Sequence, residues 1–186
     1  EDTEAPVGRP DAATVVFGHG LLFSGRMFDD QVDRLAPRYR CVTIDWRGQG
    51  RSPAADGGYD MDTLADDAAA IIQELALGKV HWVGLSMGAM VGQGLAIRHP
   101  ELLKGLVLAN TTAQYPDAGK AAWAQRIAAV EAGGMAAVAD MVVERYLHAD
   151  YRHLAAAASL GSAFLADQSR TSPESDMPSA PLRVVK

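Results

Sequence analysis

The sequence holds 186 residues with a formal net charge of −6, and 48% of its residues are hydrophobic while 22% are charged. These proportions are those of an ordinary globular domain with enough apolar side chains for one sizeable core. The acidic balance argues against a nucleic-acid partner, because such binding requires clustered lysines and arginines. No apolar run reaches the length of a membrane span, so we expect no membrane partner either.

One cysteine, Cys41, lies within an apolar run that predicts a strand. We interpret it as a buried hydrophobic side chain rather than a catalytic thiol, and a single cysteine excludes an intrachain disulfide. The sequence shows no signal-peptide pattern. Together these features favour a reducing, cytoplasmic location.

Strands and helices alternate along the first part of the chain, after an irregular lead-in that holds the remnant of one strand. Apolar and β-branched runs predict strands at 14–17, 40–44, 80–83 and 105–109. Helical periodicity and capping signals predict helices at 27–35 and 62–75, the second with Asp62 as its N-cap, and a third that Pro100 ends. Such alternation predicts an α/β fold: a mostly parallel, doubly wound sheet with helices on both faces.

The motif Gly84-x-Ser86-x-Gly88 joins the third strand to the third helix. This context predicts a sharp turn in which Ser86 occupies a strained backbone position with its hydroxyl exposed above the sheet. Gly84 and Gly88 are the positions where a side chain would collide with the neighbouring strand or helix. The helix N-terminus then directs free N–H groups toward the site where an anion would form.

The helix after this turn is rich in small residues. We expect Gly88, Gly92 and Gly94 to face the sheet. Apolar contacts are expected from four further positions, namely Met90, Val91, Leu95 and Ile97.

The pattern changes after residue 116, where no strand interrupts a long helical stretch. Helices are predicted at 121–132, 135–147 and 154–165, with Gly133 and Gly134 separating the first two. The predicted domains are a core at 1–116, a helical cap insertion at 117–170, and a linker with the start of a further core strand at 171–186.

Three motifs in this order resemble the α/β-hydrolase fold: His19-Gly20 after a strand, Asp45-x-Arg47-Gly48-x-Gly50-x-Ser52, and Gly84-x-Ser86-x-Gly88. The stretches 84–88, 106–111, 123–127 and 133–135 are similar to the 3-oxoadipate enol-lactonase branch, which shares much with bacterial carboxylesterases. The resemblance covers residues 14–150. It implies a serine hydrolase that acts on an ester or lactone through an acyl-serine intermediate.

The resemblance also implies residue roles. Ser86 would be the nucleophile, and the backbone amides of Leu21 and Met87 would form the oxyanion hole, with Leu22 a less favoured donor. An apolar substrate pocket is expected from Leu22, Phe23, Trp123 and Met87.

Three other residues of the motifs are expected to serve the structure, and a fourth is left without a role. The resemblance implies that His19 braces its loop rather than acting as the base, and that Asp45 and Arg47 pin a loop. Gln49 stands where many relatives have histidine, and the sequence assigns it no mechanism.

A serine nucleophile needs a general base and an orienting acid, which the family places after the serine in the order Asp, His. Neither has a matching position here: His99 ends the third helix, His148 and His153 lie in the cap, Asn110 carries an amide, and Asp117 falls off the pattern. We therefore expect a fragment or truncated product that is inactive alone, and possible complementation by another chain or a second copy.

Two other readings remain open. One is a non-catalytic module that binds small ligands, and the other is a truncated remnant that folds only with a partner. No metal or other cofactor is expected, because this chemistry needs none and the five histidines do not pair at ligand spacing.

Overall fold

The computed structural model describes residues 1–146. The chain forms two compact units that divide between Ala113 and Gln114, and each is described by itself. The helix predicted at 154–165 and the linker and strand predicted at 171–186 lie outside the described residues. The domain boundaries expected from the sequence stay predictions.

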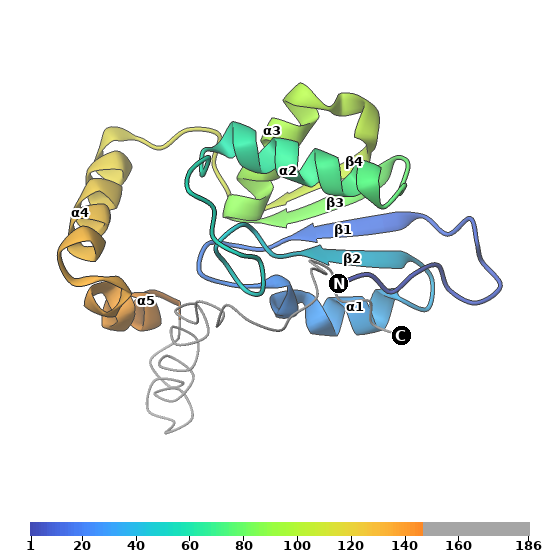
Figure 1. Ribbon diagram of the computed structural model, residues 1–186, viewed down its shortest axis with the longest axis horizontal. Coiled ribbons are helices and arrows are strands. Elements are labelled where there is room, and N and C mark those ends of the chain that lie inside the picture. Colours follow the sequence, from blue (N-terminus) through green and yellow to red (C-terminus); the bar gives the residue numbers. More distant parts are fainter. Residues whose placement is uncertain (147–186) are drawn as a thin grey trace, which may run out of the picture. The chain divides into compact units, whose positions relative to one another are not determined.

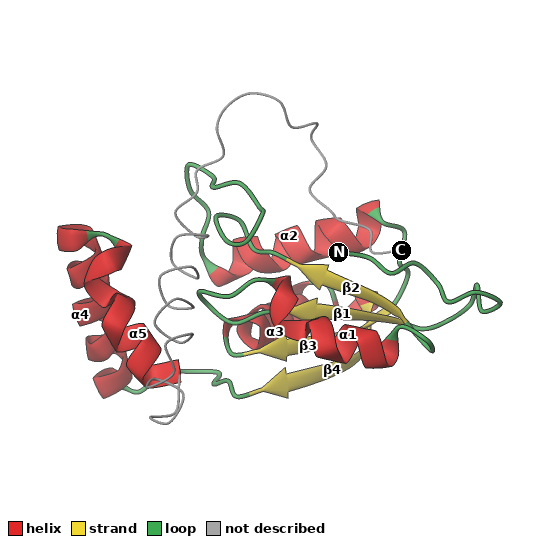
Figure 2. Cartoon of the chain, turned by 90° about the horizontal axis from the view of Figure 1, so that it is seen from below, coloured by secondary structure: helices red, strands yellow, loops and turns green. Residues whose placement is uncertain are grey.

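A four-stranded parallel sheet forms the centre of the first unit (Figure 2). Its strands are β1 (Thr14–Gly18), β2 (Arg40–Ile44), β3 (Val80–Leu85) and β4 (Leu103–Ala109). Their spatial order is β2-β1-β3-β4, so the chain moves outward from β1 to β2 and then returns past β1 to β3. The strand order therefore reverses between β1 and β3.

Helices cover both faces of this sheet, as the α/β pattern predicted. Figure 1 shows α1 (Asp29–Leu35) on one face and α2 (Met61–Glu74) with α3 (Met87–Arg98) on the other. A 3₁₀ turn at Gly25–Phe28 precedes α1, and another at Pro100–Leu102 follows α3.

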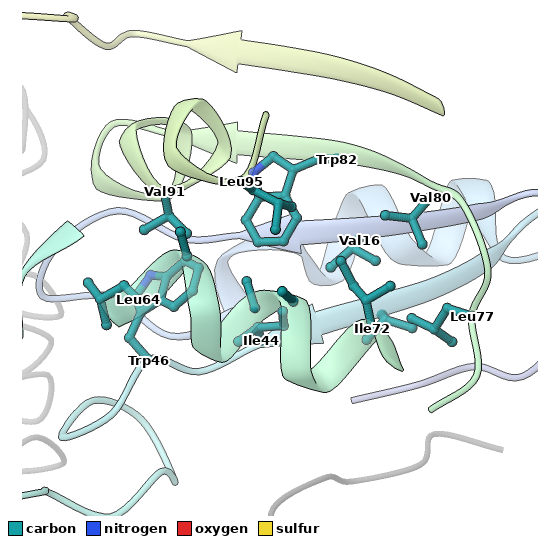
Figure 3. Close-up of a cluster of buried hydrophobic side chains, with 14 residues drawn as sticks. Val16, Ile44, Trp46, Leu64, Ile72, Leu77, Val80, Trp82, Val91 and Leu95 are labelled. Atoms are coloured by element: carbon teal, nitrogen blue, oxygen red, sulfur yellow. The ribbon is translucent and has the colours of Figure 1, made fainter. Parts of the chain in front are cut away.

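The strand sequences are largely apolar because helices cover much of both faces of the sheet, while Val107 and Leu108 on β4 stay 54% and 42% exposed. On the α2/α3 side a large core holds two tryptophans (Figure 3), with Val16, Ile44, Trp46, Leu64, Ile72, Val80, Trp82, Val91 and Leu95 among its members. On the α1 side a smaller core contains Val15, Phe17, Phe28 and Cys41. Burial raises the pKa of the Cys41 thiol to about 11, which fits its interpretation as a small hydrophobic residue.

Close packing of α3 depends on small residues, as expected, but the expected contacts of Gly94 and Ile97 were wrong. A Cβ at Gly92 would lie 2.7 Å from the Trp82 ring, so this glycine does face the sheet. Gly94 instead faces α2, where a Cβ would lie 3.0 Å from that of Ala65. Ile97 is 81% exposed and supplies no core contact, because the helix turns it away from both the sheet and α2.

The N-cap of α2 is Asp60 rather than Asp62. The Asp60 carboxylate accepts hydrogen bonds from the Thr63 amide at 2.9 Å and the Thr63 hydroxyl at 2.8 Å. Asp62 lies inside the first turn, where its charge still favours the helix N-terminus. Both residues suit this position chemically, so the sequence alone did not distinguish them.

The lead-in contributes a short antiparallel pairing to β2. Asp2 forms a bridge with Val42, and the Thr3 amide donates to the Cys41 carbonyl at 2.9 Å. Asp2 is buried and forms an ion pair with Arg40. This pairing corresponds to the strand remnant expected before residue 14.

The second unit begins with α4 (Asp117–Gly133), which starts earlier than expected. A 3₁₀ turn at Met135–Val138 and helix α5 (Ala139–Tyr146) occupy the stretch predicted as one helix at 135–147. Gly134 has a φ of 66°, a left-handed conformation that separates α4 from the turn. Through residue 146, no helix is both long and apolar enough to cross a membrane.

One carboxylate joins the end of α3 to α2. Asp66 on α2 accepts hydrogen bonds from Arg98 at 2.6 and 2.9 Å and contacts the His99 Nε2 at 2.7 Å. The hydrogen bonds from Arg98, and then that of His99, lower the pKa of Asp66 to about 2. His99 therefore takes part in the contact between the end of α3 and α2.

We predict that Gly92→Ala destabilises the fold despite the higher helix propensity of alanine. The new Cβ would press on Trp82, whose indole is buried and donates to the Gly88 carbonyl at 3.0 Å. The free energy of unfolding, measured by urea titration, should fall by about 1–3 kcal/mol. Gly57→Ala is the control, because nothing lies within 4 Å of a Cβ there. An equal loss in both variants would contradict the packing argument.

We also predict an acid-dependent contribution from Asp66. Its folded-state pKa of about 2 lies below the ordinary 3.8, so its contribution is fully present above 3.8 and is lost as the pH falls through about 2. The difference in unfolding free energy between the parent and Asp66→Asn should therefore shrink across this window. Asp56→Asn, in an exposed loop, is the control. A difference that stays constant from pH 5 to pH 2 would refute the assignment.

Candidate active site

The C-terminal ends of β1 and β3 meet where the strand order reverses. In open α/β sheets, ligands bind beyond the carboxyl ends of the strands at such a switch point. Gly18 pairs with Gly84, so the segments that follow the two strands leave the sheet side by side. These segments carry Leu21 and Leu22 after β1 and Ser86 and Met87 after β3.

Ser86 occupies the turn between β3 and α3 in a strained conformation. Its φ of 51° and ψ of −111° lie outside the regions that a residue with a side chain ordinarily adopts. A Cβ at Gly84 would lie 2.5 Å from the Ala89 nitrogen, and one at Gly88 would lie 2.8 Å from the His19 carbonyl oxygen. Glycine at both positions allows this tight turn, as expected from the motif, and Ser86 itself is half-buried.

The end of β4 braces this turn. The Ser86 amide donates to the Ala109 carbonyl at 2.9 Å, and the Thr111 hydroxyl donates to the Ser86 carbonyl at 3.0 Å. Asn110 between them has a φ of 46°. Sequence reasoning considered Asn110 only as the place for an acid and missed Thr111. The available signal was a hydroxyl residue just past the end of the strand that pairs with β3.

The segment after β1 touches the same turn. A Cβ at Gly20 would lie 3.6 Å from the Ser86 Cβ. Leu21 follows Gly20, and Met87 is the first residue of α3. Among residues 1–146, the backbone amides of Leu21 and Met87 have no hydrogen-bond acceptor. Both N–H groups are therefore available to donate a hydrogen bond.

His19 braces the loop after β1 and is fully buried. Its Nδ1 lies 2.7 Å from the Gly20 carbonyl oxygen, and its Nε2 lies 3.3 Å from the Trp46 amide. A carbonyl only accepts and an amide only donates, so the proton resides on Nδ1 and the ring is neutral. Burial lowers the pKa of His19, in keeping with this state. With both nitrogens occupied, His19 cannot serve Ser86 as a base.

The loop after β2 holds the loop after β1 at two points. The Gln49 Oε1 accepts from the Leu22 amide at 2.9 Å, and the Asp45 Oδ1 accepts from the Gly25 amide at 2.6 Å. The Leu22 amide is therefore occupied. Sequence reasoning assigned Gln49 no role, because its partner lies 27 residues away and no local pattern reveals it.

Arg47 pins the same loop to α2. It forms two hydrogen bonds with Asp67, at 2.6 and 2.7 Å, and a third with the Gly57 carbonyl at 3.0 Å. Asp45 and Arg47 thus hold loops in place, as the sequence suggested, rather than facing Ser86.

No histidine or carboxylate within residues 1–146 forms a hydrogen bond with the Ser86 hydroxyl. His99 is bound to Asp66, and Asp117 begins α4 in the second unit. His148 and His153 lie outside the described residues. In the same part of the chain, no three His, Cys, Asp or Glu side chains are grouped closely enough to hold a metal ion.

The expected pocket residues come from both units. Leu22 and Phe23 lie in the loop after β1, and Leu22 has a left-handed φ of 69°. Trp123 lies on α4 in the second unit, where the Arg126 guanidinium stacks 4.5 Å from its ring centroid. The substrate pocket formed by Leu22, Phe23 and Trp123 stays a prediction.

Comparisons with known proteins agree with this geometry. The family model described as alpha/beta hydrolase fold matches residues 13–174. 3-Oxoadipate enol-lactonase 2 of Acinetobacter baylyi is 30% identical over 142 residues, which are 76% of this chain and 52% of that protein. A Rhizobium rhizogenes protein named as a carbamate hydrolase, RutD, is 38% identical over 107 residues, which are 55% of this chain and 39% of that protein.

A solved structure supports the same relationship. The enol-lactonase from Burkholderia xenovorans LB400 superposes with a TM-score of 0.74 at 27% identity, covering 90% of this chain and 62% of that one. The chain spans about half the length of the curated relatives it matches. The resemblance to the enol-lactonase branch expected from the motifs is confirmed by these relatives. The chain therefore belongs to the α/β-hydrolase fold family.

Proposed function

We propose that this chain carries the nucleophile and oxyanion hole of a serine hydrolase that acts on a small ester or lactone. The observation that carries the proposal is the strained Ser86 turn in contact with the loop after β1. Strain of this kind persists only where the surrounding structure enforces it, and it gathers at functional sites. We assign the oxyanion hole to the amides of Leu21, which follows Gly20, and Met87, which follows Ser86, and the Gly20 contact with Ser86 supports this assignment.

In the proposed reaction, the Ser86 oxygen attacks the acyl carbon while a general base takes its proton. The carbonyl π-electrons move to oxygen, and the amides of Leu21 and Met87 stabilise the resulting anion. The carbon–oxygen bond to the leaving group then breaks, and the departing alkoxide receives the proton. A lactone differs only in that its leaving group stays attached to the acyl chain. Water afterwards releases the acyl group from Ser86.

The substrate class follows from the chemistry of the site and from the relatives. An enol-lactonase and a protein named as a carbamate hydrolase are among them, and both names describe attack on a carbonyl carbon. Esters and lactones suit the apolar side chains of Leu22 and Phe23. We propose no nucleic-acid partner, in view of the net charge of −6, and a reducing, cytoplasmic location in view of the buried, unpaired Cys41.

We further propose that the base and acid are not supplied by residues 1–146, because no histidine or carboxylate there reaches Ser86. A second candidate function, a non-catalytic module that binds small acyl ligands, rests on the same observation. Both candidates keep the pocket and the oxyanion amides. They differ in whether the Ser86 hydroxyl reacts when a base is provided.

The test is phosphonylation of the full 186-residue chain by an alkyl fluorophosphonate, with imidazole added as an external base. The oxygen–phosphorus bond forms at Ser86, the phosphorus–fluorine bond breaks, and imidazole takes the proton. We expect slow labelling without imidazole and a rate that rises with imidazole concentration by about tenfold, which is less than the roughly 100-fold or more that a positioned side chain contributes. Intact mass and peptide mapping measure the label.

Ser86→Ala should abolish the label, and Ser24→Ala, in the loop after β1, should retain it. Label on another serine would overturn the nucleophile assignment. Rapid labelling without imidazole that persists when His148 and His153 are both replaced by alanine would overturn the proposal that residues 1–146 supply no base. Absence of label at saturating imidazole, together with saturable ligand binding, would favour the non-catalytic module.

A further inference from the structure

Gln49 lies in a tight loop between two glycines with left-handed backbone. Gly48 has a φ of 71° and Gly50 a φ of 57°. The Gln49 amide donates to the Trp46 carbonyl at 2.9 Å, and its carbonyl accepts from the Ser52 amide at 3.1 Å. The backbone of Gln49 is thus fixed on both sides. Its side chain is half-buried, and its Oε1 accepts a hydrogen bond from the Leu22 amide.

Leu22 adopts a conformation that leucine avoids. A φ of 69° is unfavourable for a residue with a side chain relative to the right-handed region. The hydrogen bond from the Leu22 amide to Gln49 Oε1 at 2.9 Å offsets part of this cost. Without that acceptor, the peptide between Leu21 and Leu22 is free to rotate toward an unstrained conformation.

Rotation of that peptide matters because it changes the ψ angle of Leu21 and releases the Leu22 N–H, which would then compete with the Leu21 N–H as the oxyanion donor. With Gln49 present, the Leu22 amide is occupied and the Leu21 amide is available. We propose that Gln49 is a positioning residue: its side-chain oxygen holds the Leu22 amide, and thereby fixes Leu21 as the oxyanion donor. This inference rests on the proposed function, since it concerns the oxyanion hole of the same site.

A neighbouring contact separates this role from general loop support. The Asp45 carboxylate holds the same loop at Gly25, three residues after Leu22. Loss of Gln49 should therefore leave the loop anchored at Gly25 while releasing Leu22. The expected defect is confined to the step in which negative charge develops on oxygen.

The experiment compares Gln49→Met, which has similar length but no comparable acceptor, with Gln49→Glu, which keeps a side-chain oxygen. Gln73→Met, exposed on α2, is the control for the substitution itself. The first measurement is hydrogen exchange of the Leu22 amide by ¹⁵N NMR. We expect exchange to accelerate about tenfold in Gln49→Met, and to stay close to the parent in the other two variants.

The second measurement is imidazole-assisted phosphonylation of Ser86, separated into probe affinity and the rate of the covalent step. In Gln49→Met the covalent rate should fall about tenfold or more with probe affinity unchanged, because a displaced donor weakens only the charged transition state. Gln49→Glu should recover most of that rate. A general loss of structure would instead weaken affinity and lower the urea midpoint.

The outcomes distinguish this inference from the proposed function. A Leu22 amide that exchanges equally slowly in Gln49→Met overturns the inference, whatever the labelling. Faster Leu22 exchange with an unchanged covalent rate also overturns it, since the loop would then be released without effect on the oxyanion hole. If Ser86 of the parent takes no label even with imidazole, the proposed function fails, and the inference fails with it, whatever the Leu22 exchange rate. Faster exchange with a slower covalent step supports both.

Discussion

The contact between the first turn of α3 and the ends of β1 and β3 is the constraint on which the rest of the site depends. It requires backbone to meet backbone, and a Cβ at Gly84 or Gly88 would overlap main-chain atoms of the neighbouring segment. A Cβ at Gly18 would press on the two buried tryptophan rings. Because three glycines leave this space, the Ser86 turn and the loop after β1 can lie together at the C-terminal ends of β1 and β3. Neither segment alone would bring Ser86 against Gly20.

Three hydrogen bonds, two with the end of β4 and one with the loop after β2, hold the strained residues at this corner. Ser86 is fixed by the Ala109 carbonyl and the Thr111 hydroxyl at the end of β4. Leu22 is fixed by Gln49 in the loop after β2. The backbone cost is therefore distributed over loops that follow all four strands. This arrangement explains why polar contacts are concentrated beyond the C-terminal ends of the strands, while the strands themselves are mostly apolar.

Much of the fold could be predicted from the sequence because its signals are local. The apolar runs predicted all four strands, and Gly84-x-Ser86-x-Gly88 predicted a strained turn, since both depend on neighbouring residues. The errors arose where tertiary contacts decide. Gly94 faces α2 rather than the sheet, Ile97 faces away from both, and Asp60 caps α2 instead of Asp62. The periodicity of a helix shows which residues share a face, but it does not show which element packs against that face.

The candidate site shows the same division between local and long-range information. Ser86 follows from its motif, whereas the partners of Leu22 and Ser86 lie 27 and 25 residues away along the chain. No periodicity encodes such pairings, because they depend on which strands become neighbours. The sequence suggested a supporting role for His19, and the geometry supplies the reason: both ring nitrogens are bonded to the backbone.

The two buried tryptophans give this corner an intrinsic optical reporter. Trp46 donates its indole proton to the His19 carbonyl at 2.9 Å, and Trp82 donates to the Gly88 carbonyl at 3.0 Å. Their ring centroids are 6.1 Å apart. One indole is therefore bonded to the segment after β1 and the other to the turn that holds Ser86, while the third tryptophan, Trp123, belongs to the second unit. With Trp123 replaced by phenylalanine, the tryptophan fluorescence of this chain would come from the two indoles bonded to these segments.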